Sequence, residues 1–145
     1  MSELPNLAPK PAASLAKWHA MVARKDLSEL DAIVHADATF RSPMAFKPYR
    51  SGQAVALIIR TVLNVFEDFS YHRQLATPDG LSVVLEFSAR VGDRQLKGID
   101  LISFDADGKI IDFEVMVRPM SGLQALGAAM GERVGAMLPP FKAAD

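Results

Sequence analysis

The sequence contains no cysteine, which excludes a disulfide scaffold, a thiolate metal site and a cysteine nucleophile. It has no excess of basic residues either, since 16 lysines and arginines stand against 17 acidic residues, so no broad positive field favours nucleic acid. No apolar run reaches the roughly 18 residues of a membrane-spanning helix, and the first residues lack the basic segment of a signal peptide. We therefore expect a soluble, cytoplasmic protein that binds neither nucleic acid nor membranes.

Several motifs that carry chemistry are also missing. The sequence has no glycine-rich phosphate loop and no nucleophile elbow. Its three histidines, His19, His35 and His72, fall on different predicted elements and have no metal-ligand spacing. We therefore expect neither a metal ion nor another cofactor.

What the chain does have is enough apolar sequence for one well-packed domain. Half of its 145 residues are hydrophobic, and a chain of this length can bury a sizeable core without disulfides or metals. Three prolines in the first dozen residues predict an irregular arm over 1–13. We expect a single domain over 14–138, followed by a tail over 139–145.

The spacing of apolar residues predicts an α+β domain. They recur every three or four positions over 14–34 and over 55–66, which predicts three helices, with a short strand at 38–42 between the second and the third. A period of two over 69–118, interrupted by turn signals, predicts four antiparallel strands. Helical spacing returns over 122–138, so a further helix closes the domain.

A two-residue hairpin turn at Gly92-Asp93 predicts the register of two of these strands and places Leu85 opposite Asp100. Asp100 then lies in the middle of a strand, on a face that is otherwise apolar. Burial could keep this carboxyl protonated, a cation could keep it ionised, or it could lie at a solvated rim. Strand alternation makes Arg73 the candidate cation. The sequence leaves the three alternatives open.

Two segments resemble the nuclear transport factor 2-like superfamily, which includes the ketosteroid isomerases and the SnoaL-like polyketide cyclases. The first is Ala38-Thr39-Phe40-Arg41-Ser42-Pro43, preceded by Asp26-Leu27 and followed by Ser51-Gly52, and the second runs from Gly98 to Ile110. The resemblance implies a curved antiparallel sheet that wraps around the N-terminal helices into a cone. It also implies one deep, mostly apolar cavity and dimers formed through the convex face of the sheet. The apolar stripe of the last predicted helix, at Leu123, Leu126, Met130, Val134 and Met137, predicts that this helix packs at or beside the cavity mouth.

The resemblance transfers only part of an active site to this chain. Ser42 stands where the isomerases have their catalytic aspartate, and Trp18 stands where they have an oxyanion-hole tyrosine. Asp100, eight residues before Gly108, matches their second oxyanion donor. Val115 stands where the cyclases and limonene epoxide hydrolases place an acid. Because a serine without a neighbouring base abstracts protons poorly, the known steroid isomerase route is not expected.

Two functions follow as alternatives. The first is a cavity-bearing dimer that binds a small, mostly apolar metabolite. The second is an isomerase- or cyclase-like enzyme acting on a small carbonyl or a steroid- or polyketide-like substrate, with Asp100 as acid or oxyanion donor. In both, Asp100 is the candidate catalytic residue, and the expected ligand contacts are Trp18, Phe40, Ser42, Met44, Tyr71, Leu85, Phe87, Phe113, Val115 and Val117. The expected dimer face carries Val84, Ile99, Leu101 and Met116 among charged side chains.

Overall fold

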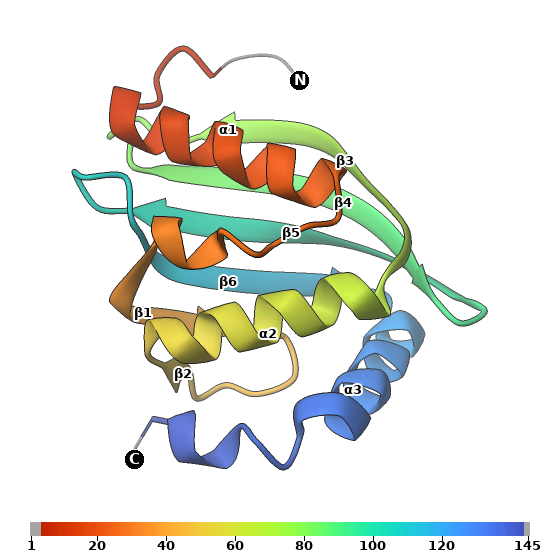
Figure 1. Ribbon diagram of the computed structural model, residues 1–145. Coiled ribbons are helices and arrows are strands. Elements are labelled where there is room, and N and C mark those ends of the chain that lie inside the picture. The colour runs from red at the N-terminus through yellow and green to blue at the C-terminus, as the bar shows by residue number, and fades with distance from the viewer. Residues whose placement is uncertain (1–3, 144–145) are drawn as a thin grey trace.

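The computed structural model describes residues 4–143, which form six strands, three α-helices and two short 3-10 helices (Figure 1). In chain order these are α1 (Pro9–Ala23), η1 (Leu30–Ile33), β1 (Val34–Arg41), β2 (Tyr49–Arg50), α2 (Gly52–Val65), β3 (Glu67–Ala76), β4 (Ser82–Val91), β5 (Arg94–Phe104), β6 (Ile110–Arg118), α3 (Met120–Val134) and η2 (Pro139–Phe141). The expected α+β class is confirmed.

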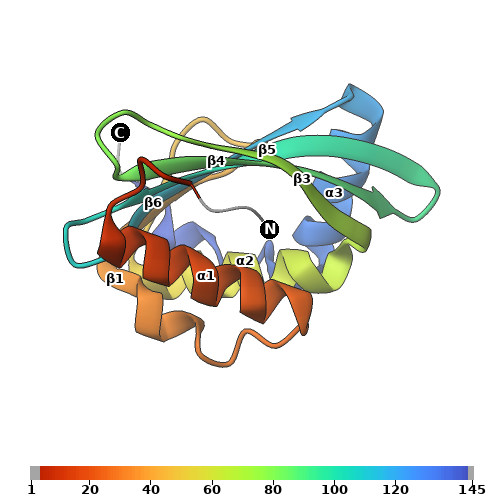
Figure 2. The ribbon, with the colours of Figure 1, turned by 90° about the horizontal axis from the view of Figure 1, so that it is seen from above.

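The strands form one curved sheet in the order β2-β1-β6-β5-β4-β3. The sheet is mixed rather than wholly antiparallel, because β1 runs parallel to β6. Helices α1 and α2 lie on the concave face, and neither covers the opposite, convex face (Figure 2). Helix α3 packs against α2 and against β4, β5 and β6. The expected cone, with its C-terminal helix at one end, is therefore present.

The first two predicted helices differ from the observed ones at their ends. Helix α1 begins at Pro9 rather than at Ser14, because a proline is tolerated in the first helical turn, where backbone N–H groups have no intrahelical partner. The second helix is only the short η1, and Val34 already begins β1. Residues 1–3 of the expected arm and 144–145 of the expected tail lie outside the described residues.

The register of β4 and β5 is the predicted one, with Leu85 opposite Asp100. Strand β3 departs from strict alternation, because its pairing with β4 shifts by one residue between Tyr71 and Gln74. This β-bulge places two residues, His72 and Arg73, opposite one residue of β4. Tyr71 keeps its expected place on the concave face, whereas Arg73 moves to the convex face.

The core fills the space between the concave face and the first two helices. Its most completely buried side chains include Trp18, Leu30, Ile59, Phe87 and Phe104. A smaller cluster under α3 contains Phe87, Leu96 and Leu126. No helix in the part of the chain that the structure describes is long and apolar enough to cross a membrane.

Candidate functional site

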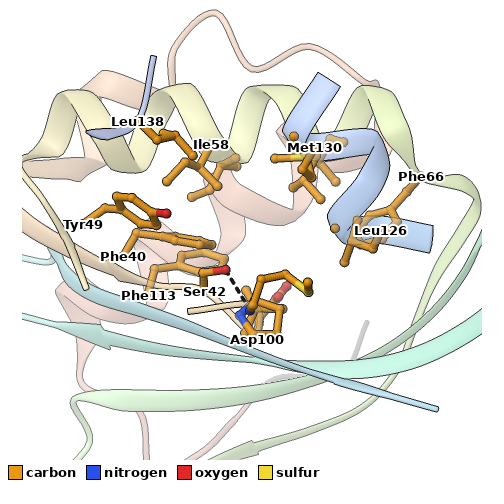
Figure 3. Close-up of a pocket in the computed structure, with 18 of the residues that line it drawn as sticks. Phe40, Ser42, Tyr49, Ile58, Phe66, Asp100, Phe113, Leu126, Met130 and Leu138 are labelled. Atoms are coloured by element: carbon orange, nitrogen blue, oxygen red, sulfur yellow. Dashed lines mark hydrogen bonds between the residues drawn. The ribbon is translucent and has the colours of Figure 1, made fainter. Parts of the chain in front are cut away.

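A cavity of about 430 Å³ lies between the concave face of the sheet, α2, α3 and the segment after α3. Its wall is mostly apolar (Figure 3). Asp100 is the only carboxylic acid among the described residues that line it. The site is therefore an apolar chamber with a single acidic group.

Asp100 lies in the middle of β5, between Leu85 on β4 and Val115 on β6. Its residue exposure is 6%. The Tyr71 hydroxyl donates a hydrogen bond to Asp100 Oδ2, with an O···O distance of 2.6 Å. No other described residue hydrogen-bonds the carboxyl, so Oδ1 is free to interact with a molecule in the cavity.

Tyr71 connects Asp100 to the first helix. The indole N–H of Trp18 donates to the Tyr71 hydroxyl oxygen at 3.0 Å, so that hydroxyl accepts one hydrogen bond and donates its own proton to Asp100. The rings of Phe69 and His19 contact the Tyr71 ring edge to face, with centroids at 4.8 and 5.3 Å. These contacts fix the position of Tyr71 and therefore the position of Asp100 Oδ2, which accepts its hydrogen bond.

Burial raises the pKa of Asp100 to about 7, and the hydrogen bond from Tyr71 offsets only part of this rise. Burial, followed by the nearby Asp100 charge, raises the pKa of Tyr71 well above its usual value. The candidate cation, Arg73, does not lie beside Asp100. Arg73 instead binds Glu86 on the convex face, at 2.7 Å, because of the bulge in β3. The hypothesis that Arg73 pairs with Asp100 is wrong, and Asp100 can carry a proton near neutral pH.

Ser42 supplies a second polar group to the wall. It directly follows β1, and its Oγ accepts a hydrogen bond from the backbone N–H of Met44 at 3.0 Å (Figure 3). This contact uses the oxygen of the hydroxyl but not its hydrogen, and no described residue accepts that hydrogen. Ser42 can therefore donate a hydrogen bond to a molecule in the cavity.

The structure brings most of the expected ligand contacts together. The cavity wall includes Asp100 with Trp18, Phe40, Ser42, Met44, Phe113 and Val115. Tyr71 lies behind Asp100. Leu85 and Phe87 are buried in the core, Val117 packs in the cluster under α3, and none of the three belongs to the cavity wall.

The sequence predicted one wall residue on a helix, Trp18 of α1, and none on α2 or α3. Helix α2 contributes Ile58, Ile59, Val62 and Leu63, and α3 contributes Leu126, Gly127, Met130 and Gly131. The apolar residues of the sequence nevertheless indicated both helices as possible parts of the wall. The 55–66 segment is apolar around most of its circumference, as expected for a helix packed on two sides, and Leu126 and Met130 lie in the predicted apolar stripe of the last helix.

Comparisons with known proteins agree with this architecture. The SnoaL-like domain model matches residues 15–113. The structure of a steroid delta-isomerase from Pseudomonas aeruginosa is 65% identical, with a TM-score of 0.90, over 92% of this chain and 97% of that one. The structure of an uncharacterized protein with a cystatin-like fold, from Silicibacter pomeroyi DSS-3, is 34% identical, with a TM-score of 0.78, over 86% of each chain.

A more distant structure shows the same fold. The epoxide hydrolase/cyclase-like enzyme SalBIII, which acts in pyran ring formation in the polyether salinomycin, is 18% identical, with a TM-score of 0.62, over 78% of this chain and 93% of that one. Comparison with curated proteins gave no match. The chain belongs to the SnoaL-like domain family and has the nuclear transport factor 2-like fold.

Proposed function

We propose that this protein binds a small, mostly apolar molecule in its cavity and holds an oxygen atom of that molecule against Asp100. The observation that carries the proposal is a single buried carboxyl, with one uncommitted oxygen, in an otherwise apolar wall. The cavity volume falls within the range of about 300–1,000 Å³ that is usual for ligand sites. A ligand that fills the cavity would shield this oxygen from water, so a ligand that supplies a hydrogen-bond partner for it gains affinity.

The hydrogen bonds available in the cavity favour a carbonyl compound. Tyr71 already donates to one oxygen of Asp100, so the protonated carboxyl presents its O–H from the other oxygen. The Ser42 hydroxyl offers a second donor. The oxygen of a carbonyl compound can accept both hydrogen bonds. The apolar remainder of the compound would contact side chains such as Phe40 and Ile58.

Fluorescence can test binding, because Trp18 is the only tryptophan and lines the cavity. Titration with the polycyclic ketone 4-androstene-3,17-dione should change its emission in a saturable way. Asp100→Leu should weaken binding by about tenfold or more, since one buried hydrogen bond is worth about 1–3 kcal/mol. Asp100→Asn keeps a hydrogen-bond donor at this position and should weaken binding less than Asp100→Leu does. Glu86→Gln alters a similarly buried carboxyl on the convex face and should have no effect. Equal affinity in Asp100→Leu would contradict the proposal.

A second candidate function is isomerisation of an unsaturated ketone. The pKa of Asp100 near 7 suits proton transfer at neutral pH, and a 65% identical protein is called a steroid delta-isomerase. In this reaction a proton leaves the carbon between the carbonyl and the double bond and returns at the far end of that double bond, with no net oxidation. The ionised Asp100 would carry the proton, and Ser42 would donate to the carbonyl oxygen as negative charge develops there. In this scheme Ser42 is the oxyanion donor, a role that the sequence analysis had given to Asp100, and Asp100 is the base.

Conversion of androst-5-ene-3,17-dione to its conjugated isomer, followed by ultraviolet absorbance, tests this candidate. Asp100→Asn should lower kcat by a hundredfold or more while still binding the product, because an amide cannot carry the proton. Ser42→Ala should lower kcat by about tenfold or more, as loss of an oxyanion donor does. Full activity in Asp100→Asn would exclude the mechanism and leave the binding function standing.

We also propose that two copies associate through the convex face, where Met116 is 46% exposed and Ile99 and Leu101 are half-buried, beside charged side chains. An apolar centre with a charged rim is the usual composition of an interface between identical subunits. Sedimentation should show a species of twice 15.8 kDa, and Met116→Lys should shift it towards the monomer. A species of about 16 kDa alone at micromolar concentration would contradict the dimer.

A further inference from the structure

The cavity wall contains one cationic side chain, and it lies apart from Asp100. Among the described residues that line the cavity, only Lys142 carries a positive charge and only Asp100 carries a negative one. Lys142 follows η2, where the chain returns from α3 towards β2 at the edge of the sheet (Figure 1). Asp100 lies on β5, and the strands β6 and β1 separate β5 from β2. The wall therefore has an acidic end and a basic end.

Backbone pairing places the side chain of Lys142 on the cavity side of its segment. Lys142 lies opposite Tyr49 in an isolated antiparallel bridge, and beside this pair the backbone N–H of Ala143 donates to the Pro48 carbonyl oxygen at 2.8 Å. Opposed residues of an antiparallel pair have their side chains on one face, and these side chains are closest where the flanking residues make the hydrogen bonds. Tyr49 pairs in turn with Phe40, and all three residues belong to the cavity wall.

Both side chains at the basic end have uncommitted hydrogen-bond donors. The Tyr49 hydroxyl points into the cavity (Figure 3). No hydrogen bond or ion pair within residues 4–143 uses this hydroxyl or the Lys142 ammonium. Two donors match the two oxygens of a carboxylate, whereas a phosphate group has at least three acceptor oxygens to satisfy.

We infer that Tyr49 and Lys142 bind a carboxylate, so that the cavity takes an apolar oxo acid with its carbonyl group at one end and its carboxylate at the other. The inference rests on the proposed ligand-binding function and adds the class of ligand. The carbonyl oxygen of the ligand lies against Asp100, and the apolar chain crosses the wall between the two ends. The reverse orientation is unfavourable, because a ligand carboxylate beside Asp100 would place two acidic groups together in a buried site.

The spacing of the strands sets the length of such a ligand. Neighbouring strands lie about 4.8 Å apart, so the four steps from β5 to the segment that contains Lys142 cover roughly 19 Å along the sheet. Asp100 and Lys142 extend into the cavity from a curved sheet, which shortens the distance that the ligand must bridge. A chain of ten carbon atoms, about 11 Å long when extended, is therefore a suitable probe.

Calorimetric titration with 9-oxodecanoate and with its methyl ester tests this inference. The two probes share the ketone and the chain, and only the first carries a negative charge. At pH 6 the acid is ionised, while Asp100, with a pKa of about 7, is mostly protonated. Lys142→Gln should weaken binding of 9-oxodecanoate at least fivefold and binding of the ester less than twofold. Tyr49→Phe should likewise weaken binding of the acid more than binding of the ester.

Two further variants separate a contact with the ligand from a general effect of charge. Lys142→Arg keeps the positive charge and should retain most of the affinity for the acid. Arg50→Gln is the matched control, because it removes a positive charge from an exposed position of β2, next to Tyr49 but outside the cavity wall. It should change the affinity for neither probe. Lys142→Gln should melt at the same temperature as the unchanged protein, because the side chain that it replaces is exposed and unpaired within residues 4–143.

The outcomes distinguish this inference from the proposed function. An unchanged affinity for the acid in Lys142→Gln, or equal weakening of acid and ester, would overturn the inference. An equal loss of acid affinity in Arg50→Gln would overturn it as well, because the effect would then belong to the charge of the whole surface. If the unchanged protein binds the ester but not the acid, the inference fails and the proposed function stands. Failure to bind the acid, the ester and 4-androstene-3,17-dione would overturn the proposed function itself.

Discussion

Two carboxyl groups lie on opposite faces of adjacent strands and differ sharply in their chemistry. Glu86 on β4 and Asp100 on β5 are almost equally covered, with residue exposures of 7% and 6%. Glu86 accepts hydrogen bonds from Arg73 at 2.9 and 2.7 Å and lies 3.0 Å from the Lys97 ammonium. These cations hold the pKa of Glu86 far below its usual range, whereas burial without a cation raises the pKa of Asp100 to about 7.

The comparison shows that residue exposure alone does not decide the state of a carboxyl, because Glu86 lies just beneath exposed cations whereas Asp100 lies deep among apolar side chains. The depth of the group and the charge of its partners decide it together. Glu86 remains ionised and joins three strands through its ion pairs with Arg73 on β3 and Lys97 on β5. Asp100 has the neutral Tyr71 hydroxyl as its only hydrogen-bond partner among residues 4–143, so it can gain or lose a proton near neutral pH and can bind a ligand oxygen.

Asp100→Asn should produce the largest change in stability. Because the folded-state pKa of Asp100, about 7, lies above its unfolded value of about 3.9, the free energy of unfolding should fall as pH rises from about 4 to about 7. The total loss is on the order of 4 kcal/mol. Asp100→Asn lacks this pH-dependent loss of stability, because an amide does not ionise. Urea denaturation should therefore find it about as stable as the unchanged protein at pH 4.5 and more stable at pH 8. Lower stability of the variant at pH 8 would show that the carboxylate is paired.

Tyr71→Phe should have the next largest effect, and it acts on the same face. It removes the acceptor for the Trp18 indole N–H and the donor to Asp100 Oδ2, at a cost of about 1–3 kcal/mol. The pKa of Asp100 should rise further, since the lost hydrogen bond favours the ionised form. Tyr49→Phe is the matched control, because that ring also lines the cavity. Equal losses in the two variants, measured by chemical denaturation, would argue against the Trp18–Tyr71–Asp100 chain.

Glu86→Gln should have the smallest effect, because its partners face solvent, with side-chain exposures of 80% for Arg73 and 48% for Lys97. The pKa of Glu86 is lowered in the folded state, so its stabilisation is complete above pH 4 to 5 and is lost as pH falls further. The melting temperature of the variant should be slightly low at pH 7, and the difference should shrink in high salt and at pH 3. A loss larger than that of Tyr71→Phe would reverse the proposed ranking of the two faces.

Local sequence signals were sufficient to predict strand register where a single turn determines how two whole strands pair. The Gly92-Asp93 turn leaves one register for β4 and β5, so the pairing of Leu85 with Asp100 and of Glu86 with Ile99 could be predicted residue by residue. The apolar face then made Asp100 conspicuous. Its hydrogen bond with Tyr71 agrees with the predicted face of both strands.

The partner of Asp100 and the full cavity wall could not be predicted, for two physical reasons. One extra residue in β3 moves Arg73 to the convex face, and an alternating pattern does not reveal such a bulge. The cavity wall depends on how α3 and residues 135–143 pack against α2 and β2, which are distant in sequence.

The most direct test of the account is the titration of Asp100 itself. Carboxyl carbon chemical shifts, assigned by comparison with Asp100→Asn and followed by NMR from pH 3 to pH 9, report its protonation in the folded protein. The account predicts a midpoint near pH 7 for Asp100, whereas Glu86 stays ionised throughout this range. A midpoint for Asp100 at or below about 4, the ordinary value of an aspartate, would contradict the claim that the cavity holds a buried carboxyl without a cation beside it.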